Sequence, residues 1–181
     1  MPPRSRDKSA GLFHVYTHCV WAVPALYRDD VDRLEFLRHL ARVTRKTGWT
    51  CLAYCLMTSH YHLIVRVENG VLPCAMHRLN LAYARHHNRR HGLRGHVQFE
   101  RYGSRRLNDS FELAIAFAYA ANNPVKVGLC STAVAWPWSS YAGTIGVKSL
   151  ASFVDPGELI RDFAQTGIDP RAALRVFVEG A

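Results

Sequence analysis

The feature that most constrains the fold is a pair of apolar β-strand patterns with almost no chain between them. The first pattern covers Trp49 to Leu56 and the second covers His60 to Val67, and a tight Thr58-Ser59 turn joins them. Both stretches are rich in β-branched, aromatic and other apolar residues, which favour extended backbone. A connection this short joins neighbouring strands only in antiparallel order. The sequence therefore predicts a hairpin within an antiparallel sheet.

Strand and helix patterns on both sides of the hairpin complete the order of elements. They predict a strand over 13–21, a helix that Asp29 or Asp30 caps and Gly48 ends, and after the hairpin a long helix over 73–91. A strand over 97–107 follows, and then a helix from about 111 to 122 that Asn108 or Asp109 caps and Pro124 terminates. The order β-α-β-β-α-β followed by α is the split βαβ pattern. We therefore predict an α+β, ferredoxin-like fold: an antiparallel sheet with helices on one face, and extra C-terminal helices over 156–166 and 170–179.

Length and composition indicate one soluble domain. The chain has 181 residues, of which 49% are hydrophobic, enough to bury a sizeable core. We expect a disordered basic tail over 1–12, the main domain over 13–143, and a helical extension of the same domain over 144–181. No stretch approaches the ~20 apolar residues of a membrane helix, and the polar N-terminus does not resemble a signal peptide. The five cysteines form no Cys-x-x-Cys pair. These features favour a cytoplasmic protein with no membrane partner.

The charge distribution points to a polyanionic partner. Lysine and arginine total 23 against 14 acidic residues, and the stretch 71–99 contains no acidic residue at all. A basic stretch can be a solvated helix face, but such a face normally mixes both signs. We therefore predict that nucleic acid is the partner. The candidate DNA-binding residues are Arg78, Arg85, Arg89, Arg90 and Arg94 in or after the long helix, and Arg101, Arg105 and Arg106 in the strand that follows.

The second strand of the hairpin begins with His60-Tyr61-His62. Side chains alternate along a strand, so His60 and His62 project from one face while Tyr61 and Leu63 point to the other. Two imidazoles on one face can supply half of a divalent-metal site. The alternative is a pair of partly buried histidines whose nitrogens are satisfied by hydrogen bonds. The His-x-His spacing alone does not separate the two interpretations.

A second polar pair lies on the helix expected over 111–122 and at its end. Tyr119 and Asn123 are one helical turn apart, so their side chains share a face. Each also has a structural interpretation. A tyrosine at this position can pack in an amphipathic helix, and an asparagine before Pro124 can serve helix termination.

Together these segments resemble a known family, the single-tyrosine HUH transposases, and especially the REP-associated tyrosine transposases (HUH denotes His-hydrophobic-His). The resemblance spans roughly residues 13 to 143. Four blocks carry it, in family order: residues 53–63 (AYCLMTSHYHL), 83–92 (YARHHNRRHG), 95–102 (GHVQFERY), and 119–129 (YAANNPVKVGL) with 136–141 (WPWSSY).

The resemblance implies roles for individual residues. It implies that His60, His62 and Asn123 ligate a divalent metal, Mg²⁺ or Mn²⁺, and that Tyr119 is the nucleophile. The implied reaction is cleavage and rejoining of single-stranded or hairpin DNA through a 5′-phosphotyrosine. A neutral phenol needs activation for this attack, and a cation beside it can polarise the scissile phosphate. By themselves the two histidines favour a later transition metal.

The resemblance also implies a nucleoid-associated protein, with a monomer favoured and a homodimer possible. The chain departs from the family at Thr58-Ser59, where Pro-Asn is usual, at Glu100 in place of glycine, and at Gly103 in place of a basic residue. Two other functions stay open at this point. One is a catalytically silent nucleic-acid-binding protein on the same fold. The other is a zinc hydrolase that uses the histidines and Cys55.

Overall fold

The fold is built on a four-stranded antiparallel sheet with the strand order β2-β3-β1-β4. We describe residues 9–18, 25–93, 102–164 and 167–180 of a computed structural model. The strands are β1 (Gly11–His18), β2 (Thr50–Leu56), β3 (His60–Val67) and β4 (Gly103–Leu107). β2 and β3 form the predicted hairpin, in which Leu56 pairs with Tyr61. The α+β, ferredoxin-like prediction is confirmed.

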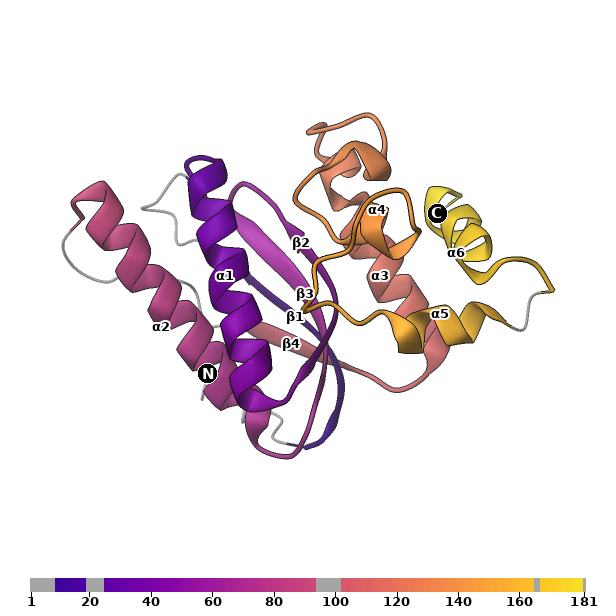
Figure 1. Ribbon diagram of the computed structural model, residues 1–181, viewed down its shortest axis with the longest axis horizontal. Coiled ribbons are helices and arrows are strands. Elements are labelled where there is room, and N and C mark those ends of the chain that lie inside the picture. Colours follow the sequence, from indigo (N-terminus) through magenta and orange to yellow (C-terminus); the bar gives the residue numbers. More distant parts are fainter. Residues whose placement is uncertain (1–8, 19–24, 94–101, 165–166, 181) are drawn as a thin grey trace, which may run out of the picture.

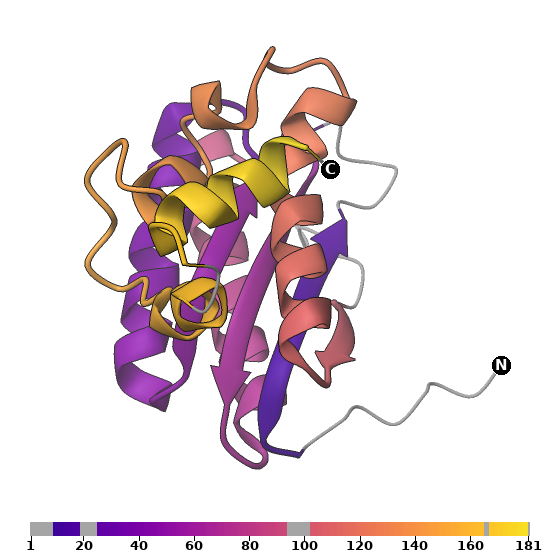
Figure 2. The same ribbon diagram turned by 90° about the vertical axis from the view of Figure 1, so that its right-hand side faces the viewer.

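Helices cover both faces of this sheet (Figure 1). α1 (Asp30–Thr47) and α2 (Val71–His91) lie side by side on one face. α3 (Ser110–Lys126) crosses the other face, and Figure 2 looks onto this layer, with the yellow α6 beside α3. The extra helices are η1 (Ala133–Ala135), α4 (Tyr141–Thr144), α5 (Gly157–Phe163) and α6 (Pro170–Glu179). The two helices of the split βαβ unit lie on one face, as predicted. The prediction of helices on one face alone is corrected by α3, which packs with the C-terminal helices on the other face.

Each face of the sheet has its own apolar core. Side chains that alternate along β3 enter different cores: Tyr61, Leu63 and Val65 pack with α1 and α2. Ile64 packs with α3 and the C-terminal helices instead. His62 shares the α3 face with Ile64, because both lie at even positions of the same strand. The pattern of β3 therefore places the paired histidines beneath α3.

Both ends of α1 agree with the predicted caps, Asp29 and Gly48. The Asp29 side chain accepts a hydrogen bond from the Asp32 amide at 3.1 Å, which satisfies one of the free N–H groups of the first turn. The helix ends at Gly48, whose φ of 69° is the left-handed conformation that glycine adopts readily. α2 begins at Val71 rather than at residue 73 and ends, as predicted, at His91 before Gly92.

Other predicted boundaries also need correction. Gly11 and Leu12 belong to β1 rather than to a disordered tail, and Leu12 is buried against the α3 core. The last predicted strand is shorter within the described chain, because β4 starts at Gly103. Pro124 does not terminate α3, which continues to Lys126. Proline removes one backbone N–H donor from the helix, and Pro124 itself is buried. The following turn still forms, because the Val127 N–H donates a hydrogen bond to the Asn123 carbonyl at 3.2 Å.

The remaining predictions for residues 1–8, 19–21, 97–101 and 165–166 lie outside the described residues. Within the described parts of the chain, no helix is both long and apolar enough to cross a membrane.

Candidate functional site

A pocket of about 550 Å³ opens between the sheet and α3, and it contains all four residues of the two predicted polar pairs. Three strands and one helix build it, because β1, β3 and β4 present alternate side chains to the face that α3 crosses. The lining residues are His14, Tyr16, His60, His62, Arg105, Leu107, Glu112, Ile115, Ala116, Tyr119 and Asn123. Residues far apart in the sequence thus meet around one cavity.

His62 lies at the centre of the polar contacts in this pocket. It is buried, with 4% of its surface exposed, and its Nε2 is 3.3 Å from the Asn123 side-chain Nδ2. Its ring centroid is 5.4 Å from that of Tyr119, and the two rings are nearly perpendicular. His60 is half-buried; its ring lies 5.1 Å from that of His62, and its Nδ1 is 3.2 Å from the Ser59 hydroxyl.

His14 is a member of the site that the motif patterns do not indicate. Its Nε2 lies 3.0 Å from His62 Nδ1. Burial, and to a lesser extent the positive charge of Arg105, lower the pKa of His14 to about 4, so the ring is neutral at pH 7. A neutral imidazole has one acceptor nitrogen, which here can accept the His62 Nδ1–H, so that the His62 Nε2 lone pair is directed toward Asn123.

A signal for His14 was present in the sequence. His14 and Tyr16 alternate with Phe13 and Val15, which are core residues on the α1 and α2 face. In the split βαβ order the first strand neighbours the third, and here β1 pairs with β3 along its length. A polar residue on the correct face of strand one is therefore a candidate neighbour of the histidine pair.

The pocket residues fit a divalent cation by their chemistry. His60 and His62 offer imidazole nitrogens, and the buried Asn123 offers an amide whose oxygen and nitrogen exchange places on a half-turn of the side chain. Two ligands that share one cation at about 2.1 Å lie roughly 3 Å apart, which is close to the 3.3 Å between His62 Nε2 and the Asn123 amide. His62 and Asn123 could therefore contact the same ion after that half-turn.

Tyr119 combines access to solvent with contact to the histidines. Its side chain is 45% exposed, and its ring centroid is 6.0 Å from that of His14. The Lys126 ammonium lies 5.5 Å from the centroid of the same ring, so a positive charge lies beside the tyrosine. A large substrate can reach the phenol from outside while the buried imidazoles lie behind it.

The glycine at residue 103, one of the departures from the family pattern, has a steric explanation. A Cβ atom at this position would lie 2.5 Å from the Tyr16 ring, closer than real Cβ contacts permit. Tyr16 pairs with Gly103 across the β1–β4 ladder and lines the pocket. A basic side chain at residue 103 would therefore displace Tyr16.

The predicted DNA-binding arginines are divided between the two faces of the sheet. Arg105 lines the pocket and forms an ion pair with Glu112 at 3.1 Å. Arg106 points elsewhere: its guanidinium lies 5.8 Å from the Phe13 ring centroid and bonds the Ser9 hydroxyl. Arg78, Arg85 and Arg89 are exposed on α2, across the sheet from the pocket, and Arg90 on the same helix is paired with Asp29 and Asp32. Arg94, Glu100 and Arg101 lie outside the described residues.

Comparison with known proteins identifies the family. The family model described as "Transposase IS200 like" matches residues 12–123. A solved structure described as a REP-associated tyrosine transposase bound to a REP hairpin has a similar fold, with a TM-score of 0.67 and 16% sequence identity. The similarity covers 88% of this chain and 93% of that one. No protein with a curated description matches the chain. Because the family model spans well over half of the sequence, the chain belongs to the IS200-like transposase family.

Proposed function

We propose that this transposase cleaves and rejoins single-stranded DNA with Tyr119 as its nucleophile and a divalent metal, Mg²⁺ or Mn²⁺, on His60, His62 and Asn123. The observation that carries the proposal is the meeting of these four residues around one pocket, with the Tyr119 and His62 ring centroids 5.4 Å apart. When bound, the metal would polarise the scissile phosphate and orient it for in-line attack.

The covalent step exchanges one phosphate ester for another. The Tyr119 Oη forms a bond to phosphorus while the bond from phosphorus to the 3′-oxygen breaks, and the phenolic proton is transferred in net terms to the departing 3′-oxygen. The products are a 5′-phosphotyrosine and a strand with a free 3′-hydroxyl. Because the bond energy stays in the phosphotyrosine, the reverse attack by a 3′-hydroxyl rejoins strands without ATP.

The buried residues hold the site ready for this step. His14 accepts the Nδ1–H of His62, so the His62 Nε2 lone pair faces Asn123 and the cavity. Asn123 and Tyr119 follow one another by a single turn of α3, so the helix fixes the ligand and the nucleophile in one rigid unit. Arg105, which lines the same pocket, supplies positive charge for a phosphate oxygen.

The surface of α3 continues from the pocket as a path for unpaired nucleotides. Phe111, Ile115 and Tyr119 follow one another at one-turn spacing, and their side chains are 67%, 44% and 45% exposed. Exposed apolar side chains next to a cationic group are typical of surfaces on which single-stranded bases stack. The similar solved structure is bound to a REP hairpin, which supports hairpin DNA as the substrate. The single-stranded flank is required by the proposed cleavage of unpaired DNA.

Two further features belong to the proposal. We place the catalytic domain over residues 11–143, since β1 begins at Gly11, with 144–181 as its helical extension. We further propose that the protein acts on DNA in the cytoplasm, at the nucleoid. We favour a monomer, because every residue of the proposed chemistry lines one pocket of one chain.

Covalent attachment is the decisive test. An end-labelled hairpin with a single-stranded flank is incubated with the protein and Mn²⁺ and then separated on a denaturing gel. We expect a protein–DNA adduct from the natural chain and none from Tyr119→Phe. Tyr102→Phe is the matched control, since its ring packs with the core on the opposite face of the sheet. An adduct formed by Tyr119→Phe would exclude Tyr119 as the nucleophile, and a binding-only protein would form none in any variant.

A further inference from the structure

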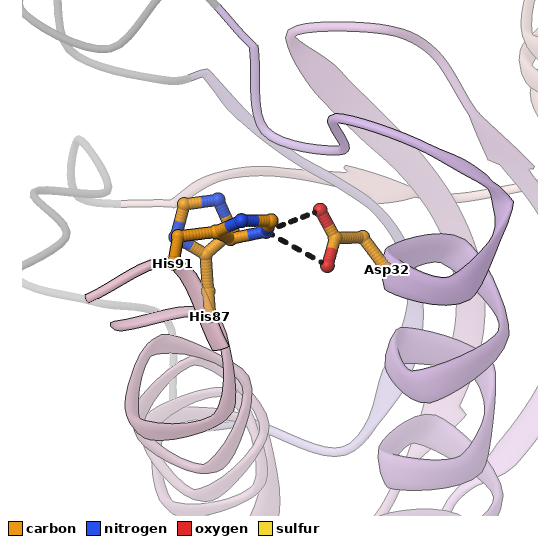
Figure 3. Close-up of side chains that lie close together, drawn as sticks. All are labelled: Asp32, His87 and His91. Atoms are coloured by element: carbon orange, nitrogen blue, oxygen red, sulfur yellow. Dashed lines mark hydrogen bonds and ion pairs between the residues drawn. The ribbon is translucent and has the colours of Figure 1, made fainter. Parts of the chain in front are cut away.

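A second cluster of metal-ligating side chains lies between α1 and α2, on the opposite face of the sheet from the pocket. Asp32 lies in the first turn of α1, and His87 and His91 lie in the last turns of α2 (Figure 3). The two histidines are one helical turn apart and therefore project from the same side of α2. One ligand atom from each of the three residues lies within 4.8 Å of the other two.

The unusual member of this cluster is His87. Its side chain is fully buried, with 0% exposure, and neither ring nitrogen has a hydrogen-bond partner among the described residues. Buried polar atoms are nearly always paired, because leaving one unpaired forfeits its hydration. The His87 ring lies 4.5 Å from that of His91 and close to a buried carboxylate. A cation bound at this point would give one of the two nitrogens a partner.

Asp32 and His91 already have a separation suitable for sharing an ion. His91 Nε2 is 2.9 Å from one Asp32 oxygen and 3.1 Å from the other. Ligands that share a cation at about 2.1 Å are separated by roughly this distance. One His87 ring nitrogen lies within 4.8 Å of the nearest ligand atoms of both residues.

The net charge of Asp29, Asp32 and Arg90 favours binding of a cation. Arg90 contacts Asp32 at 2.6 Å, but it also makes two bonds to Asp29, at 2.7 and 2.8 Å. Arg90 can therefore stay bound to Asp29 while Asp32 directs an oxygen to a metal. The two carboxylates carry one more negative charge than Arg90 neutralises.

We propose that Asp32, His87 and His91 form a second metal site, for Zn²⁺ or a similar late transition ion. Two imidazoles and one carboxylate are a usual ligand set for zinc, with the fourth position available to water. The ion would join the C-terminal end of α2 to the start of α1. This site shares no residue with the pocket beneath α3, so it stands or falls independently of the proposed DNA chemistry.

The test uses the full chain with His60→Ala and His62→Ala, which removes the imidazoles of the pocket. Metal-free protein is equilibrated with Zn²⁺, and bound zinc is measured by elemental analysis after dialysis. Co²⁺ is then used as a spectroscopic substitute. We expect one equivalent of zinc, a visible Co²⁺ spectrum typical of tetrahedral N/O coordination, and a higher melting temperature with zinc.

Further variants in the same background locate the ion. His87→Leu and His91→Gln should each reduce bound zinc to background, whereas His77→Gln should retain it, because His77 is exposed on the same helix outside the cluster. Circular dichroism establishes that each variant is folded, and His91→Gln alone decides the question if the buried His87→Leu change prevents folding. Failure of the His60/His62 variant to bind zinc overturns the proposal. Zinc retained by His91→Gln overturns it as well, and would point to cysteines such as the exposed Cys74.

Discussion

The two faces of the sheet each bring histidines together, but they do so in different surroundings. Beneath α3, the buried His62 borders a cavity of about 550 Å³ and the half-exposed Tyr119. Between α1 and α2, His87 is enclosed completely and its neighbours are a carboxylate and another imidazole. An open cluster is accessible to a strand of DNA, whereas the enclosed His87 is out of reach of so large a ligand. We therefore expect access, rather than residue type, to separate the proposed reactive site from the proposed structural one.

The strongest test of this comparison acts on the open face. His62→Ala should abolish covalent attachment to DNA, because it removes the imidazole that lies nearest both Asn123 and Tyr119. The fold should survive, since the side chain borders a cavity rather than the apolar core. Adduct yield on a denaturing gel and Mn²⁺ affinity by calorimetry measure the two effects. Unchanged Mn²⁺ affinity would move the metal away from this pocket.

The second prediction concerns His14, which we regard as a positioning residue. His14→Phe keeps a ring at this place but removes the acceptor for the His62 Nδ1–H. Loss of such a partner of a ligating histidine typically weakens metal binding by about 10–100-fold. His14→Gln, whose amide oxygen can accept the same bond, should restore part of the affinity.

Calorimetric titration with Mn²⁺ distinguishes this role from simple packing. A packing role would lower the melting temperature of His14→Phe and leave its metal affinity unchanged. An equal loss of affinity in His14→Gln and His14→Phe would also contradict the proposed hydrogen bond.

The comparison of the two faces also shows how far sequence reasoning reaches. Alternation along His60–Val67 and the one-turn spacing of Tyr119 and Asn123 are local properties, and both were sufficient to predict which side chains share a face. The local patterns do not determine which elements lie beneath α3, because this depends on the tertiary structure. His14 could be found only by adding the strand order, and the Asp32–His87–His91 cluster depends on the packing of α1 against α2.

Helix ends illustrate the same limit. The prediction that Pro124 ends α3 rested on the local loss of an N–H group. The helix nevertheless continues to Lys126, because Pro124 is buried and the chain beyond it packs on the α3 core through Val125. Tertiary packing outweighed the local rule at this position.

The third prediction is that Arg90 contributes to stability and not to DNA binding. Arg90→Gln should lower the melting temperature, because Asp29 and the buried Asp32 lose their shared cation. It should change the salt dependence of DNA binding little, since this guanidinium is already occupied by two carboxylates. Thermal denaturation and binding titrations at several salt concentrations measure the two quantities. A large change in salt dependence with no loss of stability would contradict this assignment.

The smallest expected effect tests whether DNA also reaches the face formed by α2. Arg85 and Arg89 are exposed there without a carboxylate partner among the ion pairs of the described residues. Each phosphate contact on a single strand contributes about 0.7 to the slope of log K against log salt concentration, so Arg85→Gln with Arg89→Gln should flatten the slope by about 1.4. Unrelated sequences should weaken equally, because phosphate contacts do not read bases.

The matched control for this pair removes the same charge from the neighbouring helix. Arg42→Gln with Arg45→Gln changes two exposed arginines of α1, which lie outside the acid-free stretch. If both pairs flatten the slope equally, the effect is one of net charge and not of position. If neither pair changes it, these arginines of α1 and α2 do not contact the DNA. Arg105→Gln is then the next variant to test, because Arg105 lines the pocket beside Tyr119. The salt dependence thus decides whether the substrate contacts one face of the sheet or passes around its edge to both.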